Sequence, residues 1–169
     1  MADLLPQDRL QPALLDRLED NEPDKKTETP DKRVLTKAQL RDAVLRDLTW
    51  LLNAARPTKR DGLADWPEVE RSVLNYGMPS FSGETASSLD VSDVEKAIRE
   101  ALIQFEPRII AGTLRVSANQ SDNIMDWHNI VSVSIEAMVW AQPVPLQLML
   151  RTQLDLESGL IEVSDAGSY

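Results

Sequence analysis

Residues 130–140 read Ile-Val-Ser-Val-Ser-Ile-Glu-Ala-Met-Val-Trp, and this stretch decides the fold class. Apolar and polar side chains alternate along it with a period of two, which is typical of a strand buried on one face. A second alternating stretch follows the break at residues 143–145. The two apolar faces comprise Val131, Val133, Ile135, Ala137 and Val139 in the first stretch, and Leu146, Leu148, Leu150, Leu154 and Leu156 in the second. Two long alternating stretches joined by a short break predict paired antiparallel strands.

Two shorter strands flank this pair. Leu114 and Val116 alternate with polar residues before a polar turn over residues 119–127, which predicts a first strand. Glu157-Ser158-Gly159 has the composition of a hairpin turn, and residues 160–163 follow it as a short last strand. Because this last strand is short and near the C-terminus, we expect it to border the sheet.

Before Pro107 the apolar period is that of a helix. Thr36 and Gln39 form a capping box, and the helix that follows ends before Pro57. Its apolar face is predicted to comprise Leu40, Val44, Leu45, Leu48, Leu51 and Leu52. A long amphipathic helix is therefore expected at the start of the folded domain.

Two further helices are predicted downstream. A shorter one should run from Asp65 to Gly77, with an apolar stripe at Val69, Val73 and Leu74. The next should begin at Ser92, with Glu95 as its capping-box partner, and end at Pro107. Its buried stripe is expected at Val94, Ala97, Ile98, Ala101, Leu102 and Phe105.

Helices followed by strands indicate an α+β fold, with three N-terminal helices packed on a mostly antiparallel four-stranded sheet. We expect a single domain over residues 34–163 and a tail over 164–169. Residues 1–33 should form a flexible arm, because ten of the fifteen residues from 19 to 33 are charged. The arm carries a short apolar hook, formed by Leu14, Leu15 and Leu18. The hook could bind a partner, pack back on its own domain, or belong to a disordered tail.

Composition excludes several classes of function. The chain has 18 basic and 28 acidic residues, a net charge of −10, with the acidic excess almost wholly after residue 60. Such a chain repels phosphate and anionic lipid, so we expect neither nucleic acid nor inserted membrane as partner. No stretch is long and apolar enough for a membrane span, and no signal peptide is recognisable. There is no cysteine, and His128 is the single histidine, so no metal site or cofactor is expected.

Residues 106–108, Glu-Pro-Arg, are the strongest candidate for a functional motif. Pro107 favours an extended conformation at Glu106, so Glu106 and Arg108 should project from the same face. They could present an exposed acid–base pair to a partner, or form a local salt bridge where the helix ends. No catalytic motif is present, although the many carboxylates leave a two-carboxylate glycosidase open.

Six blocks of sequence, in order, resemble the TssE family of type VI secretion baseplate subunits. The blocks are residues 14–18, Asp47-Leu48 with Leu51-Leu52-Asn53, residues 72–77, residues 106–108, residues 140–146 and residues 154–159. That family is similar to a wedge protein of contractile phage tails often labelled "lysozyme-like". The resemblance covers nearly the whole chain.

The resemblance implies a non-catalytic subunit that joins other baseplate wedge subunits to the contractile sheath, on the cytoplasmic side of the inner membrane. It makes Glu106, Pro107 and Arg108 the signature motif. The rival hypothesis is a peptidoglycan-cleaving muramidase. Arg108 beside Glu106 should keep that carboxylate ionised, which is the wrong state for a general acid. An unrelated binding domain is the third alternative.

Two further partner-binding elements are predicted. Leu14, Leu15 and Leu18 should dock in a groove on another subunit. Leu160, Ile161 and Val163 should accept a strand of the sheath at the edge of the sheet, because an edge strand has unpaired backbone groups.

Overall fold

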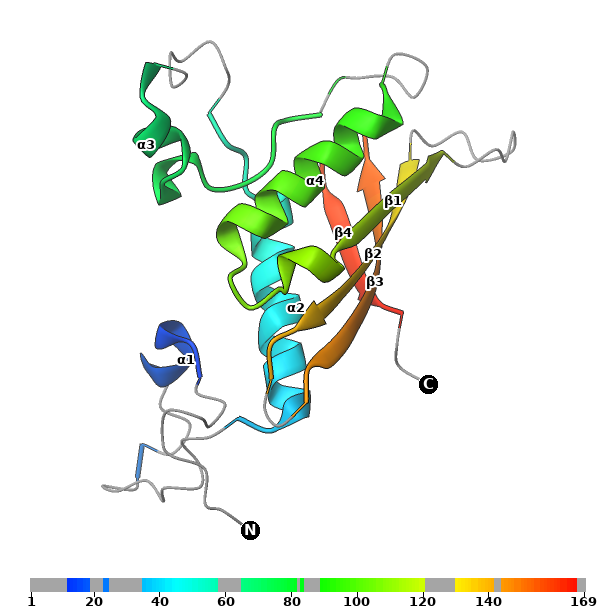
Figure 1. Ribbon diagram of the computed structural model, residues 1–169. Helices are drawn as coiled ribbons and strands as arrows, with labels where there is room; N and C mark the ends of the chain where they lie inside the picture. The colour runs from blue at the N-terminus through cyan, green and yellow to red at the C-terminus, as the bar shows by residue number, and fades with distance from the viewer. Residues whose placement is uncertain are drawn as a thin grey trace.

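The computed structural model describes residues 12–18, 23–24, 35–57, 65–81, 83, 89–120, 130–141 and 144–166 of the 169-residue chain. Figure 1 shows helices on one side and a twisted sheet on the other. The predicted α+β class and its four antiparallel strands are confirmed. Most of the arm linker over residues 19–33 and most of the predicted polar turn over residues 119–127, together with His128, lie outside the described residues. Asn119 and Gln120 were predicted to begin that turn, but they belong to the first strand.

The sheet has the simple order β1-β2-β3-β4, with every neighbouring pair antiparallel. Its strands are β1 (Arg115–Gln120), β2 (Ile130–Val139), β3 (Leu146–Asp155) and β4 (Ile161–Asp165). The alternation predicted for β2 is confirmed, since its five inward residues are all buried while Ser132, Ser134 and Glu136 are exposed. β4 lies at one edge as predicted, although it begins one residue later than expected and continues through Asp165.

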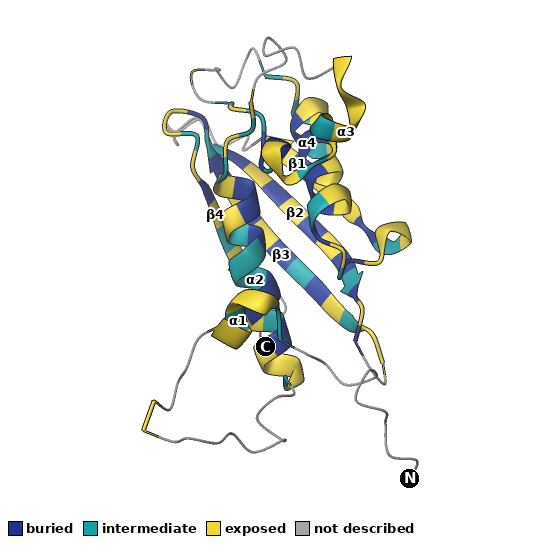
Figure 2. Cartoon of the chain, turned by 90° about the vertical axis from the view of Figure 1, so that its left-hand side faces the viewer, coloured by how far each residue is buried: buried dark blue, intermediate teal, exposed yellow. Residues whose placement is uncertain are grey.

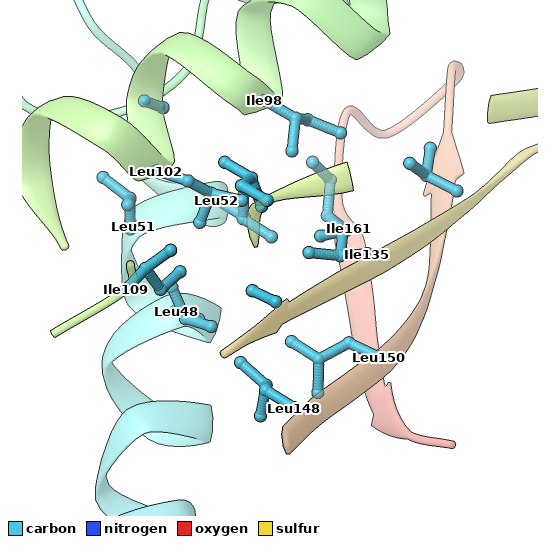
Figure 3. Close-up of a cluster of buried hydrophobic side chains, with 14 of the residues drawn as sticks. Leu48, Leu51, Leu52, Ile98, Leu102, Ile109, Ile135, Leu148, Leu150 and Ile161 are labelled. Carbon is cyan, nitrogen blue, oxygen red and sulfur yellow. The ribbon is translucent and has the colours of Figure 1, made fainter. Parts of the chain in front are cut away.

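Two long helices cover the buried face of the sheet. Helix α2 (Lys37–Asn53) contacts β4, helix α4 (Val91–Phe105) contacts β1, and the two helices contact each other. Figure 2 shows the two helices in front of the sheet, with buried and exposed residues alternating along β2 and β3 behind them. Their side chains meet those of β2 and β3 in one apolar core, where Leu48, Leu102 and Ile135 are all fully buried (Figure 3). Burying a side chain of this size contributes about 1.5–3 kcal/mol, so this core holds the domain together.

The predicted helix from Asp65 to Gly77 is wrong in length and in its apolar stripe. Only α3 (Pro67–Glu70) and a 3-10 turn, η5 (Val73–Asn75), form there, and Val73 and Leu74 are 79% and 71% exposed. The helix ends because the Ser72 hydroxyl donates to the Val69 carbonyl and accepts from the Leu74 N–H. One helical turn is too short to bury a stripe.

Gly77 joins this segment to the end of α2. Its φ of +117° is in the region that favours glycine, and a Cβ there would collide with the Ala54 carbonyl. The tight approach lets the Met78 N–H donate to the Ala54 carbonyl at 2.7 Å. Tyr76 is thereby held against α4, with its ring edge-on to Phe105 at a centroid distance of 5.3 Å.

The predicted N-terminal cap of α4 is also corrected. Asp90, not Ser92, is the capping residue, and its carboxylate accepts from the Ser92 N–H. Because the N-cap lies two residues earlier, Glu95 is not a capping partner; its carboxylate accepts from the Ala118 N–H in β1, at 2.7 Å. The capping box of Thr36 and Gln39 at the start of α2 is confirmed. Within the described residues, no helix is long and apolar enough to cross a membrane.

Candidate functional site

The Glu-Pro-Arg motif lies at the end of α4, where the chain leaves the helix toward the sheet. Glu106 is the C-cap of α4, with φ −117° and ψ 82°, and the ring of Pro107 disfavours a further helical turn. Beyond the motif the chain runs beside the end of β2. The Trp140 N–H donates to the Arg108 carbonyl and the Ile110 N–H donates to the Met138 carbonyl, both at 2.8 Å. The motif is therefore fixed at both ends by secondary structure.

Glu106 and Arg108 do project together, as predicted, but not as an exposed pair. Glu106 is only 4% exposed. The Arg108 guanidinium donates to both of its oxygens, from Nε to Oε1 at 2.7 Å and from Nη2 to Oε2 at 2.5 Å, and the Arg108 N–H also donates to Oε1. Of the two alternatives, the local salt bridge at the end of the helix is confirmed and the exposed pair is wrong, because the motif turns inward, against α2, as the chain leaves α4.

Asp47 is the residue that sequence reasoning did not assign to the site. It lies in α2, 61 positions before Arg108, and its Oδ2 accepts from Arg108 Nη2 at 2.6 Å. A signal for it exists in the sequence. Asp47 follows Val44 by three residues and precedes Leu51 by four, which puts a carboxylate beside the apolar face of the helix. Such a charge needs a cation, and the fold supplies Arg108.

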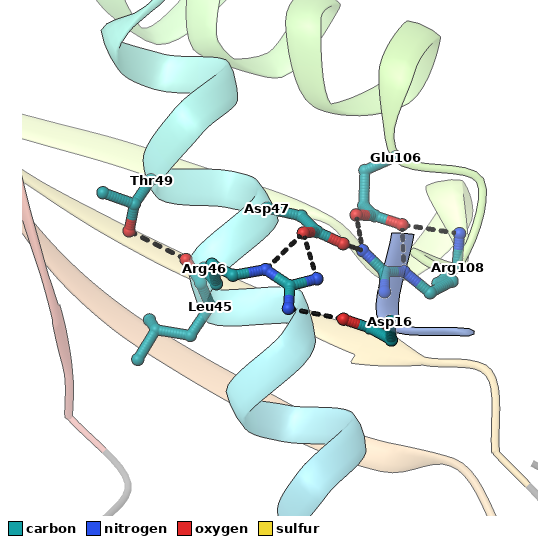
Figure 4. Close-up of polar contacts among 7 residues, drawn as sticks. All are labelled: Asp16, Leu45, Arg46, Asp47, Thr49, Glu106 and Arg108. Atoms are coloured by element: carbon teal, nitrogen blue, oxygen red, sulfur yellow. Dashed lines mark hydrogen bonds and ion pairs between the residues drawn. The ribbon is translucent and has the colours of Figure 1, made fainter. Parts of the chain in front are cut away.

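Asp47 also binds a second arginine, on its own helix. Its Oδ1 accepts from Arg46 Nε at 3.0 Å and from Arg46 Nη2 at 2.8 Å. Arg46 Nη1 in turn donates to Asp16 of α1 (Leu14–Leu18) at 2.5 Å, and the guanidinium lies 5.1 Å from the ring centre of Trp50. Figure 4 shows these contacts as one series. We call the alternating residues Asp16, Arg46, Asp47, Arg108 and Glu106 the charge chain.

Ionisation in the charge chain follows from these partners. The hydrogen bond from Arg46 is the main cause that lowers the pKa of Asp16 below its ordinary 3.8, against a smaller effect of burial. Burial opposes the charge of Arg108, but its bonds to Glu106 and Asp47 outweigh burial and raise its pKa. Arg46 is likewise held charged, since the carboxylates of Asp16 and Asp47 raise its pKa.

A cavity of about 390 Å³ lies beside the charge chain. Its walls are mostly apolar, and its polar end is formed by three residues of the charge chain. The apolar walls include Leu40, Leu51, Tyr76 and Phe105, and the polar end comprises Asp47, Glu106 and Arg108. Burial, with the nearby carboxylates of Asp47 and Glu106, raises the pKa of Tyr76, so the phenol stays neutral. An apolar pocket with charged groups at one end is suited to binding.

The arrangement is poorly suited to acid–base catalysis. Both oxygens of Glu106 already accept hydrogen bonds from Arg108. Neither oxygen can donate a proton to a substrate unless one of these two bonds breaks. Within the described residues, no group of three or more His, Asp or Glu side chains could hold a metal ion.

The other predicted site residues lie in α1 and in the last strand. Leu14, Leu15 and Leu18 are in α1 and are 74%, 52% and 75% exposed. In the last strand, Leu160 is exposed, Val163 is half-buried and Ile161 is buried. The last strand contacts α2 through the bonds between Asn53 and Ile161, whereas α1 lies next to the Glu-Pro-Arg motif, because Asp16 bonds to Arg46 of the charge chain.

Comparison with known protein families gives one match. The family model described as baseplate wedge protein gp25 matches residues 38–144, which is more than half of the chain. The chain belongs to the baseplate wedge protein gp25 family. No curated protein and no solved structure matches it.

The matched region contains most of the site. It includes α2, α4, β1, β2 and the Glu-Pro-Arg motif, and therefore four of the five residues of the charge chain. Helix α1 and the strands β3 and β4 lie outside it. The family is a structural component of phage-like baseplates, so its members assemble with other baseplate proteins.

Proposed function

We propose that this chain is a non-catalytic, TssE-like subunit of a type VI secretion baseplate, and that it links the wedge to the contractile sheath at the cytoplasmic face of the inner membrane. Three facts support the proposal. The family match gives baseplate membership, six blocks of the sequence resemble TssE, and the site is a closed network of ion pairs beside an apolar pocket.

The observation that carries the proposal is that one residue of the Glu-Pro-Arg motif is buried while the other two reach the surface. Glu106 is buried and anchors the Arg108 guanidinium, whereas Pro107 is exposed and the side chain of Arg108 remains 24% exposed. A motif built this way holds one cation and one proline at the surface in a fixed geometry. Rigid presentation of a few side chains is what an assembly interface needs, since it lowers the ordering cost of binding.

The test is co-purification with the other wedge subunits of the same baseplate. Arg108→Lys keeps the positive charge but cannot form the two-pronged bond to Glu106, so we expect wedge assembly to be lost. Arg151→Lys, on the exposed side of β3, is the matched control and should assemble normally. The charge reversal Arg108→Glu is unsuited to this test of assembly, because its new carboxylate would lie beside those of Glu106 and Asp47. Full assembly of a folded Arg108→Lys protein would contradict the proposal.

The muramidase alternative is tested with purified peptidoglycan. We expect the folded protein to release no soluble fragments, because Glu106 is committed to Arg108. Release that depends on one particular Asp or Glu would show that the chain is an enzyme.

For the sheath, we propose that one of its strands pairs with the outer edge of β4, and that this pairing does not use Ile161. The Ile161 N–H and C=O are not available, because both bond to the side-chain amide of Asn53. The Leu160 carbonyl accepts from the Asp155 N–H, whereas the next residue, Ile161, lies opposite Leu154 and directs its backbone groups away from β3. Because this alternation repeats every two residues, Val163 also directs its N–H and C=O away from β3. Val163→Pro should therefore block sheath attachment with little effect on the ladder. Sheath assembly that survives this change would place the attachment elsewhere.

We also propose that Leu14, Leu15 and Leu18 dock on a partner subunit. No residue of α1 is buried in this chain, so the hook contributes little to its own core. Deleting residues 1–20 should weaken wedge binding while the melting temperature barely changes. A large fall in melting temperature would show that the hook belongs to the fold.

A further inference from the structure

Helix α1 contributes Asp16 to the charge chain and lies beside its other members. Asp16 bonds to Arg46, the positive charge of Arg108 also acts on it, and Ala13 forms part of the wall of the 390 Å³ cavity. Figure 4 shows the end of α1 beside the Arg108 guanidinium. The segment that carries the apolar hook is thus docked on the surface that carries the Glu-Pro-Arg motif, as in the alternative in which it packs back on its own domain.

Helix α1 is held in place by few contacts with the rest of the domain. Helix α1 has five residues, which is too short to be stable alone, and its three leucines point into solvent. Asp16 anchors it through the ion pair with Arg46, and Arg46 keeps 33% of its side chain exposed. Docking also leaves Asp16 Oδ2 buried without a hydrogen bond, which costs free energy.

The rest of the charge chain does not depend on α1. Arg46 keeps two bonds to Asp47 and its contact with Trp50 if Asp16 leaves, and Arg108 keeps Glu106 and Asp47. Loss of α1 would therefore expose the surface without dismantling it. A weakly held element over an intact surface has the properties of a cover with two states.

We propose that α1 is a releasable cover over the surface formed by Arg46 and Arg108, and that its release exposes this surface and detaches the segment that carries the exposed Leu14, Leu15 and Leu18 from the domain. The importance of the covered surface rests on the proposed function, but the cover itself is a property of the isolated chain. Its release requires no change in the core.

The test measures access to the guanidinium groups in the isolated full-length protein. Phenylglyoxal modifies arginine side chains, and its rate at each arginine is read from the peptides after digestion. Asp16→Lys replaces the attractive pair with a repulsive one and should raise the rate at Arg46 about fivefold, the scale of a part-exposed ion pair, with a smaller rise at Arg108. Glu100→Lys, an equal change of charge on the exposed side of α4, should leave both rates unchanged.

Fluorine NMR supplies a second reading on the same proteins. The chain has four tryptophans, and Trp50 borders both Arg46 and the cavity. In protein labelled with fluorotryptophan, Asp16→Lys should shift the Trp50 resonance and leave Trp66 and Trp140 in place, which also shows that the fold is intact. Glu100→Lys should shift none of the three.

The two possible failures of the inference are distinct. If Asp16→Lys changes neither the Trp50 resonance nor any arginine rate, α1 does not cover this surface. If only Arg46 gains access, the cover does not reach Arg108 and the inference is also overturned. Neither result touches the proposed function, because wedge assembly is not measured.

Discussion

The two ends of the charge chain use the same chemistry in different surroundings. At one end Arg108 binds Glu106, which is 4% exposed and fixed between α4 and β2. At the other end Arg46 binds Asp16, on a five-residue helix none of whose residues is buried. Asp47 joins the two ends, with one oxygen on each arginine. The comparison teaches that burial and the stability of the supporting element, and not the ion pair itself, decide which end is structural.

Breaking the buried end should have the largest effect. Glu106→Gln removes the carboxylate charge but keeps the shape, so the Arg108 guanidinium stays in place without its main partner. We expect a loss of about 3 kcal/mol in the free energy of unfolding, the scale of a buried ion pair broken on one side. Chemical denaturation measures it. A loss below about 1 kcal/mol would mean that this end behaves like a surface pair.

The double replacement separates the charge from the network. Glu106→Gln combined with Arg108→Met removes both charges, and it should recover part of the stability that Glu106→Gln loses, because no guanidinium is left unpaired. The same denaturation measurement gives the result. If adding Arg108→Met destabilises the Glu106→Gln variant by as much as it destabilises the wild type, the two residues act independently.

The fold class was predictable from sequence, because alternation in β2 and β3 directly reports which face is buried. The same holds for the capping box at Thr36, where the two partners are three residues apart. The site was predictable only in part. Glu106 and Arg108 are neighbours in sequence, but Asp47 comes from another helix, and pairing across 61 residues depends on how α2 and α4 pack.

Two cases show the limits of local patterns. Val69, Val73 and Leu74 have helical spacing, yet the Ser72 hydroxyl ends the helix and leaves the last two exposed. The extended backbone at Glu106 predicted that Glu106 and Arg108 share a face, and it left open whether the pair is exposed or forms a local salt bridge. That reasoning gave the shared face correctly, but the direction of this face is set by tertiary packing against α2.

The joint between the two ends should show an intermediate effect. Asp47→Asn keeps one oxygen that can accept from Arg46 or Arg108, but it removes the charge that both guanidinium groups face. We expect a loss of about 1.5–2 kcal/mol, the lower end of the scale for a hydrogen bond to a charged group. Thermal and chemical unfolding measure it, with Asp42→Asn on the exposed side of the same helix as the control. A loss equal to that of Glu106→Gln would make Asp47 as structural as the buried end.

Breaking the exposed end should barely change global stability. Asp16→Asn removes the anchor of α1, but the core elements keep all their contacts, so only local docking is lost. We expect less than about 0.5 kcal/mol in global unfolding, as for other part-exposed ion pairs. Hydrogen exchange should nevertheless quicken at the amides of α1, such as the Arg17 N–H, which donates to the Ala13 carbonyl. Unchanged exchange in α1 would show that Asp16 is not its anchor.

Acidification should remove the same anchor without a mutation. The pKa of Asp16 is lowered below 3.8 in the folded chain by its bond to Arg46, so the docked state binds the proton less readily than the undocked state. Stability from this pair is therefore fully present above an undocked pKa of about 3.8 and is lost as pH falls through the lower, docked value. Other carboxylates titrate in the same range, so the quantity to measure is the difference between wild type and Asp16→Asn. Exchange in α1 should differ between the two proteins at neutral pH and converge at the acidic end. A difference that persists after Asp16 is protonated would mean that the side chain holds α1 by packing and not by charge.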